Sequence, residues 1–242
     1  MARGRADYAG TTPVEGVWGV TDLGEISARL GAGSTWERRG AVVWQDWFEH
    51  GLQPWWYYAG GSGSGVYAKL GKAYRGDLSA HLIAGSDADQ IADIRTTLPV
   101  VAYAKMGFEV ILAPISNWEY WWLTVSIYNG TRQYASMLRY YASDNSLCIY
   151  TTGGAEIVLA TGLKALFAED IWHYCKLVVD FDTHKYVRVI YEDTQYDVSD
   201  YDLWDIAATA TLRSTFYVGV NGNAGVNGTI KVGQVVLTRN EP

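Results

Sequence analysis

Residues 118–128, which read WEYWWLTVSIY, follow a two-residue alternation that fits a β-strand better than any other regular structure. Successive side chains of a strand point to opposite faces. One face of this strand would carry Trp121, Leu123, Val125 and Ile127, and we predict that it is core. The opposite face would carry Tyr120, Trp122, Thr124, Ser126 and Tyr128. Because this second face combines aromatic rings with hydroxyl groups, we expect it to be partly exposed and to suit a sugar ring or another protein's surface.

The rest of the chain from Ala41 continues in short apolar stretches separated by turn residues. Asn129-Gly130 and Asp144-Asn145 are typical turn pairs. Strands are predicted over 42–48, 66–70, 79–84, 91–98, 108–113, 118–128, 133–141, 147–151, 157–160, 172–181, 185–191, 194–198, 214–220 and 228–238. Many short strands with little helix predict an all-β, antiparallel two-sheet sandwich or jelly roll.

Two segments outside this series have other predicted structures. Residues 1–20 are rich in Gly, Thr and Pro and have no apolar period, so they indicate an extended arm. Residues 22–31 have a capping Asp and a closing Gly, which predict a short helix. We therefore expect an N-terminal arm with one short helix over 1–40 and a sandwich over 41–242. One further helical turn is expected within 200–208.

Composition limits the classes of partner. The chain has 242 residues, of which 49% are hydrophobic, and a net charge of -7. No part is basic enough to suit a phosphate backbone, so we expect no nucleic-acid partner. No apolar run approaches a membrane helix, and residues 1–8 do not begin a secretory signal. The expected location is a virion or an extracellular assembly reached without a classical signal peptide, and otherwise the cytoplasm.

Three segments resemble a known group of β-sandwiches. Residues 46–51 (DWFEHG) with 66–70 and 73–82 (AYRGDLSAHL) resemble the opening of carbohydrate-binding-module jelly rolls. Residues 228–238 (GTIKVGQVVLT) resemble their last strand. Residues 172–181 and 185–191 are similar to paired strands of concanavalin A-like lectin and glucanase domains. The resemblance covers about residues 41–242 and implies a concanavalin A-like sandwich and sugar binding.

The resemblance also implies a structural calcium ion, with Asp46 and Glu49 as candidate ligands. However, Gly233 stands where the last strand of such modules usually carries Asp, and a calcium site needs six or more oxygen ligands. We therefore expect no cofactor, with calcium as the one alternative.

The candidate sugar-binding residues are aromatic, with one cation from the following strand. They are Tyr120, Trp122, Tyr128, Arg139, Trp56 and Tyr58. If residues 55–58 form a strand, Trp56 and Tyr58 share one face. Trp55 and Tyr57 share the other, and one of these two pairs is expected to be core.

Catalytic signatures are missing from the sequence. Glycoside hydrolysis needs two carboxylates at a fixed separation, and no strand presents such a pair at alternate positions. Glu109 and Glu119 lie on predicted strands and are the only candidates for facing a groove, although single glutamates on strands are more often solvated or salt-bridged. Cys148 and Cys175 are expected to be buried free thiols. The sequence therefore favours a protein that is not an enzyme.

The arm carries Arg3, Arg5, Tyr8 and Trp18, which we interpret as contacts to neighbouring subunits. The start without a signal, the Gly-rich arm and the lectin-like body resemble viral decoration or tail proteins. The first hypothesis is a non-enzymatic subunit of a virion or similar assembly, a homo-oligomer or a partner of other shell proteins. The second is a stand-alone carbohydrate-binding module or lectin, and the third is a glucanase-like hydrolase.

Overall fold

A computed structural model describes residues 39–53, 55–71, 73–87, 89–99, 105–163, 166–209 and 211–242. The predicted arm residues, the helix over 22–31 and the contacts expected of Arg3, Arg5, Tyr8 and Trp18 lie outside the described residues. The first described strand begins at Ala41. None of the described residues forms a helix long and apolar enough to cross a membrane.

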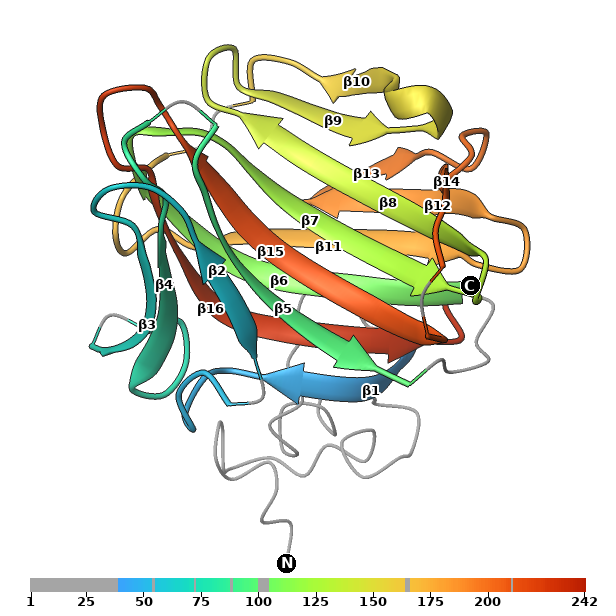
Figure 1. Ribbon diagram of the computed structural model, residues 1–242, viewed down its shortest axis with the longest axis horizontal. Helices are drawn as coiled ribbons and strands as arrows, with labels where there is room; N and C mark the ends of the chain where they lie inside the picture. Colours follow the sequence, from blue (N-terminus) through green and yellow to red (C-terminus); the bar gives the residue numbers. More distant parts are fainter. Residues whose placement is uncertain are drawn as a thin grey trace, which may run out of the picture.

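The described residues form two antiparallel sheets of eight strands each, which confirms the predicted two-sheet sandwich (Figure 1). Sheet A contains, in spatial order, β13 (Thr194–Asp197), β12 (Lys185–Tyr191), β11 (His173–Asp180), β6 (Lys105–Ser116), β16 (Thr229–Arg239), β4 (Leu78–Ile83) and β3 (Gly65–Leu70), with β1 (Ala41–Asp46) also pairing with β16. Sheet B contains β10 (Glu156–Ala160), β9 (Ser146–Tyr150), β8 (Arg132–Tyr141), β7 (Trp118–Tyr128), β15 (Arg213–Gly222), β5 (Ile91–Leu98) and β2 (Trp56–Ala59), with β14 (Trp204–Ala207) also pairing with β8.

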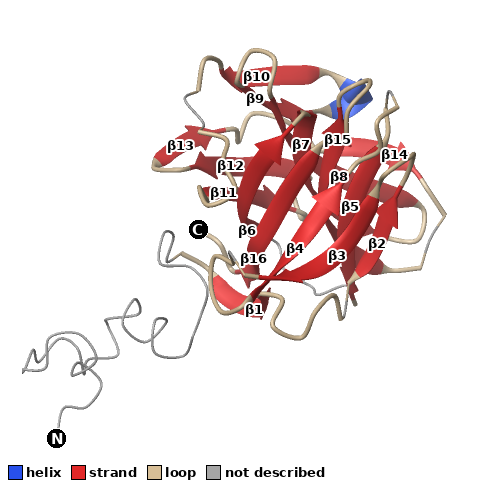
Figure 2. Ribbon diagram, turned by 90° about the vertical axis from the view of Figure 1, so that its left-hand side faces the viewer, coloured by secondary structure: helices blue, strands red, loops and turns tan. Residues whose placement is uncertain are grey.

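The described residues are almost entirely strand and loop, and their one helical segment is a 3-10 turn at Thr152–Gly154 (Figure 2). The expected helical turn within 200–208 is wrong, because Trp204–Ala207 pairs with the first half of β8. This strand matters for the site, since it places Trp204 and Ile206 beside the middle of sheet B.

Turn chemistry fixes the register of the central hairpin. The Asn129 side chain accepts hydrogen bonds from the backbone N–H groups of Thr131 (3.1 Å) and Arg132 (2.9 Å), closing the turn between β7 and β8. Pairing then runs without a shift from Tyr128 opposite Gln133 to Tyr120 opposite Tyr141. Because a slip of one residue would exchange the two faces, this register decides which side chains of β7 reach the core.

The core lies between the sheets and confirms the predicted inner face of β7. Trp121, Leu123 and Val125 are buried in it, and Ile127 packs at its border. Trp121 stacks on Tyr140 of β8, with ring centroids 5.5 Å apart. The alternate residues of β7, Trp122, Thr124 and Ser126, therefore point to the outer face of sheet B, which none of the described strands covers.

Candidate functional site

The outer face of sheet B carries an open groove of about 300 Å³. Residues from β5, β15, β7, β8 and β14 line it, so the groove crosses the middle of the sheet. The lining residues are Ile91, Asp93, Arg95, Trp122, Thr124, Ser126, Gln133, Ala135, Met137, Trp204, Ile206 and Tyr217. A hollow of mostly apolar and aromatic side chains with a few polar groups is typical of a small-molecule or sugar site.

The indole of Trp122 forms part of the groove floor, and only 8% of this residue is exposed. Trp122 lies opposite Gly219 of β15. A Cβ atom at position 219 would lie only 2.2 Å from the indole Cζ2, so the ring lies directly over the glycine. The glycine therefore allows a large ring to lie low against the sheet instead of standing up from it.

An ion pair lies on one side of the groove. Arg95 donates from Nε to Asp93 Oδ1 (2.9 Å) and from Nη2 to Asp93 Oδ2 (3.0 Å). Burial raises the pKa of Asp93, whereas the bonds and charge of Arg95 oppose that rise. The Arg95 guanidinium also lies 5.2 Å from the ring centroid of Tyr217, so the pair and the ring form one surface.

The groove also contains a buried hydroxyl group with no partner. Thr124 is 7% exposed, lines the groove beside Trp122, and its Oγ1 has no hydrogen-bond partner among the described residues. Gln133, by contrast, donates from Nε2 to Ser126 Oγ at 3.2 Å. A buried hydroxyl without a partner costs free energy. Because Oγ1 itself is sealed from solvent, a ligand's polar group would reach it only after the Thr124 side chain rotates.

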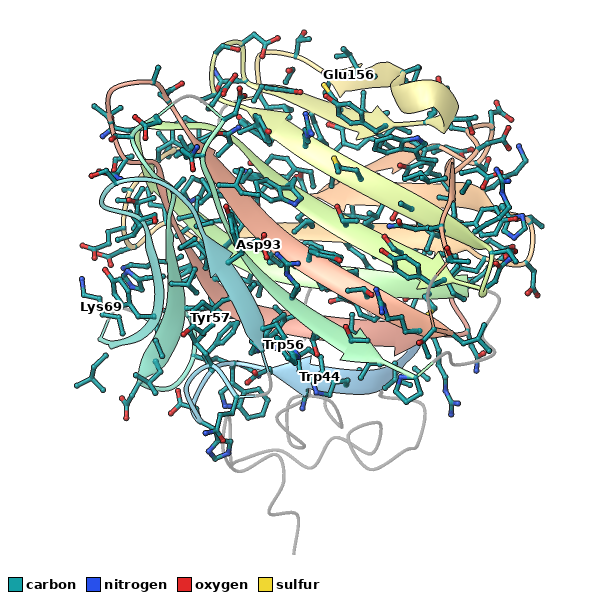
Figure 3. The ribbon with its side chains drawn as sticks, in the orientation of Figure 1. Trp44, Trp56, Tyr57, Lys69, Asp93 and Glu156 are labelled. Carbon is teal, nitrogen blue, oxygen red and sulfur yellow. The ribbon has the colours of Figure 1, made fainter. Side chains whose placement is uncertain are left out.

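The six predicted sugar-binding residues all lie on the outer side of sheet B, and the structure places them in three regions. Trp122 is in the groove itself. On β2, Trp56 lies opposite Arg95 and Tyr58 lies opposite Asp93, and these aromatic residues are 73% and 48% exposed. Figure 3 shows Trp56 on β2 and Asp93 on the neighbouring strand. Whether these residues bind sugar stays a prediction.

The other three predicted residues continue the face on either side of the groove. Tyr128 lies below the Arg213 guanidinium, 4.5 Å from the ring centroid. Arg139 lies between the rings of Tyr120 and Tyr150, at 4.4 and 4.3 Å from their centroids. It also donates to the Tyr150 hydroxyl at 2.8 Å. Arg139 thus holds aromatic rings in place on β7 and β9.

The two calcium candidates have partners within the chain. Asp46 accepts hydrogen bonds from the Phe48 N–H (2.8 Å) and the Trp55 indole (2.7 Å). Glu49 Oε1 accepts from the backbone N–H groups of Asp77 (2.7 Å) and Leu78 (3.1 Å). Across the described ranges, no group of three or more His, Cys, Asp and Glu side chains is arranged to hold a metal ion. Both carboxylates therefore serve as turn-stabilising acceptors.

The two carboxylates considered for catalysis do not share a groove. Glu109 lies on β6 of sheet A, is buried, and forms an ion pair with Lys176 at 2.9 Å. Glu109 is therefore salt-bridged and does not line the groove. Glu119 is exposed at the start of β7 and does not line the groove. The prediction for the cysteines is confirmed, since Cys148 and Cys175 are free and buried.

Four residues of the groove were not predicted as site residues from the sequence: Asp93, Arg95, Trp204 and Tyr217. Strand 91–98 was predicted, and its alternation of Ala92, Ile94 and Thr96 with Asp93, Arg95 and Thr97 already separates the two faces. Asp93 and Arg95 were thus visible as a polar pair on one face. Trp204 was hidden because the Asp-rich segment around it suggested a helical turn.

No family model and no curated protein matches the chain. Solved structures, however, do match the chain. The potassium-bound carbohydrate recognition domain of Emp46p matches with a TM-score of 0.50 and 9% identity, over 77% of this chain and 89% of that chain. A protein of unknown function with a galectin-like fold from Bacillus subtilis has a TM-score of 0.50 and 10% identity, over 83% and 97%. A β-glucanase from Bacillus licheniformis has a TM-score of 0.49 and 14% identity, over 83% and 99%.

At these identities the matches show the fold alone. The chain has the concanavalin A-like β-sandwich fold, which lectins, carbohydrate-binding domains and glucanases share. Within that class the fold does not select one function, so the function has to be argued from the site.

Proposed function

We propose that this protein binds carbohydrate, without catalysis, in the groove on the outer face of sheet B. The observation that carries the proposal is the low-lying Trp122 indole beside the Asp93–Arg95 ion pair in one open groove. A sugar ring has an apolar C–H face and a rim of hydroxyl groups. Aromatic surface for the C–H face comes from Trp122, Trp204 and Tyr217. Gln133 and the Asp93–Arg95 pair offer hydrogen-bonding groups to the rim of hydroxyl groups.

Carboxylate placement supports a binding role over hydrolysis. Asp93 is the one carboxylate among the groove-lining residues, and Arg95 engages both of its oxygens. On β10, Glu156 accepts hydrogen bonds from Tyr141 and Tyr150. Five strand spacings separate β5 from β10, roughly 24 Å at about 4.8 Å each. Glycosidases need their two carboxyl groups within about 5–9.5 Å. Figure 3 labels Asp93 and Glu156 in these separate positions.

This proposal replaces the shell subunit as our first hypothesis. The shell hypothesis depends on residues 1–40, of which all but the last two lie outside the described residues, and it stays a prediction. The groove lies entirely within residues 91–217. The carbohydrate-binding proposal therefore depends only on described side chains, and a shell protein that binds glycans would also satisfy it.

The test combines a glycan array with calorimetric titration of the best ligand, using the full chain and Thr124→Val. Valine keeps the shape of the side chain and removes the hydroxyl. Because that hydroxyl has no partner among the described residues, Thr124→Val should leave stability unchanged or raised. If the ligand uses the hydroxyl, affinity should fall roughly 2- to 10-fold, the value of one hydrogen bond of about 0.5–1.5 kcal/mol.

Thr215→Val is the matched control. Thr215 is 3% exposed, lies opposite Ser126 on the same face of the sheet, and its Oγ1 also lacks a partner. However, Thr215 is not among the groove-lining residues. Its substitution should have the same effect on stability and none on affinity. A wild-type chain that binds no glycan on a broad array, or equal affinity losses for both variants, would contradict the proposal.

A further inference from the structure

Strand β2 forms one edge of sheet B and is unusually aromatic for an exposed edge. It pairs with β5 on one side, and none of the described strands pairs with its other side. Its first three residues, Trp56, Tyr57 and Tyr58, are 73%, 60% and 48% exposed. Contiguous exposed aromatic surface on a soluble protein marks an interaction site more often than it marks bare surface.

This edge also lacks most of the usual protection against pairing with another strand. Between Glu49 and Lys69 the chain contains no Asp, Glu, Lys or Arg, and this is the longest such stretch in the sequence. Exposed edges in natural proteins are usually protected by short length, by charge, by proline or by a β-bulge, and of these β2 has only its short length of four residues. Within β2 there is no proline, and its register with β5 runs from Trp56 to Ala59 without a shift.

The hydrogen-bonding direction of β2 follows from its last bond to β5. Gly60 N–H donates to the Ile91 carbonyl at 2.9 Å, so it points toward β5. Backbone groups alternate in direction along an antiparallel strand. Tyr58 and Trp56 therefore also direct their N–H and C=O groups toward β5. Tyr57 and Ala59 direct theirs away from the sheet, where a further strand can bind.

We propose that β2 pairs with β2 of a second copy of this chain, antiparallel about a twofold axis at Tyr58. Tyr57 of each copy then lies opposite Ala59 of the other, and the two residues exchange backbone hydrogen bonds. Tyr58 lies opposite itself. The backbone N–H and C=O groups of Tyr57 and Ala59 point away from β5, so each copy supplies the donors and the acceptors that this arrangement needs.

Charge favours a second copy as the occupant of this edge. The chain has a net charge of -7, so two copies repel each other overall. At β2 they can approach without bringing like charges together. A closed twofold interface is also the commonest arrangement of soluble homo-oligomers. An oppositely charged partner protein would have nothing to recognise on this uncharged strand.

Sedimentation velocity of the full chain over a range of concentrations tests the proposal. The wild type should dimerise reversibly, and Tyr57→Lys should weaken the dimer at least 10-fold. In the proposed register the two residues 57 are diagonal neighbours, about 7–8 Å apart, so two lysines there repel. An equimolar mixture of Tyr57→Lys and Tyr57→Glu should restore the dimer. Because Tyr57 is exposed, neither charge is buried in the monomer.

Tyr67→Lys on β3 is the matched control, since Tyr67 is an exposed aromatic residue on the edge strand of sheet A. It should leave the dimer unchanged. Tyr58→Cys tests the register: with a mild oxidant such as oxidised glutathione it should form an intermolecular disulfide while the buried Cys148 and Cys175 stay reduced. A monomeric wild type, including one that instead holds a strand of another protein, overturns the proposal. So does a dimer that survives Tyr57→Lys, or a dimer in which Tyr58→Cys does not cross-link.

Discussion

Because the Trp122 indole lies over Gly219, we expect Gly219→Ala, which adds one methyl group, to disturb the groove. A Cβ atom at position 219 would lie 2.2, 2.4 and 2.6 Å from three carbon atoms of the Trp122 indole. Carbon atoms pack at about 3.5–4.0 Å. Gly219→Ala therefore requires the indole to move by more than about 1 Å. The backbones of β7 and β15 are fixed by continuous pairing on both sides, so the ring itself has to rotate out of the groove floor.

The expected cost of this overpacking is about 1–3 kcal/mol. For a chain of this size, 1 kcal/mol lowers Tm by about 2–4 °C, so Gly219→Ala should lower Tm by roughly 2–12 °C. Urea unfolding followed by circular dichroism measures the free energy directly. On the proposed function, the same variant should lose affinity for the glycan that the wild type binds, because the rotated indole occupies part of the groove.

Gly65→Ala is the control for replacing a strand glycine. Its added Cβ would meet only the Tyr67 ring, at 3.8 Å, an ordinary contact. This variant should be neutral or slightly more stable, since alanine restricts the unfolded chain. The decisive step is a double-mutant cycle with Trp122→Ala. If Gly219→Ala lowers the free energy of unfolding as much in the Trp122→Ala background as in the wild type, the steric argument is wrong.

Three further predictions concern other parts of the chain. Burial first, then the charges of Lys231 and Lys69, lower the pKa of His81 to about 4. As pH falls from 6.5 toward 4 the unfolded chain gains a proton that the folded chain does not. About 3 kcal/mol of stability should therefore be lost in that window, measured by urea unfolding, and His81→Phe should abolish this loss. Deleting residues 1–40 should leave a folded sandwich by circular dichroism but weaken assembly into larger particles in light scattering; equal assembly would contradict the arm hypothesis. No reducing sugar should be released from β-glucans, and release that is lost in Asp93→Asn or Glu119→Gln would overturn the binding role.

Strand positions and faces could be predicted from the sequence because both are local properties. Alternation along residues 118–128 placed Trp121 in the core and Trp122 outside. Sheet membership is not local, and Glu109 illustrates the difference. Its strand pairs with β11 and β16, far away in the sequence, and that pairing puts Glu109 beside Lys176 on sheet A. Alternation could identify an outward position on β6 but could not assign it to a sheet.

The groove was only partly predictable for the same reason. The aromatic face of β7 was identified, but the residues that complete the groove come from β5, β15 and β14, which the chain brings together through long-range pairing. Gly219 gave no local signal either, since a glycine within a strand usually suggests a weak position. Its role is visible only once Trp122 is known to lie opposite it.

The two proposals use different atoms of the same strand, and so they are compatible. Trp56 and Tyr58 place their side chains on the groove face, opposite Arg95 and Asp93. Self-pairing uses the outward backbone groups of Tyr57 and Ala59. Pairing two copies at β2 would therefore bring both sets of Trp56 and Tyr58 together on one continuous face. A long polysaccharide could then contact both grooves at once, and its avidity would exceed the affinity of a single groove. Tyr57→Lys should remove that gain while leaving the affinity for a short oligosaccharide unchanged, which separates the dimer from the binding site.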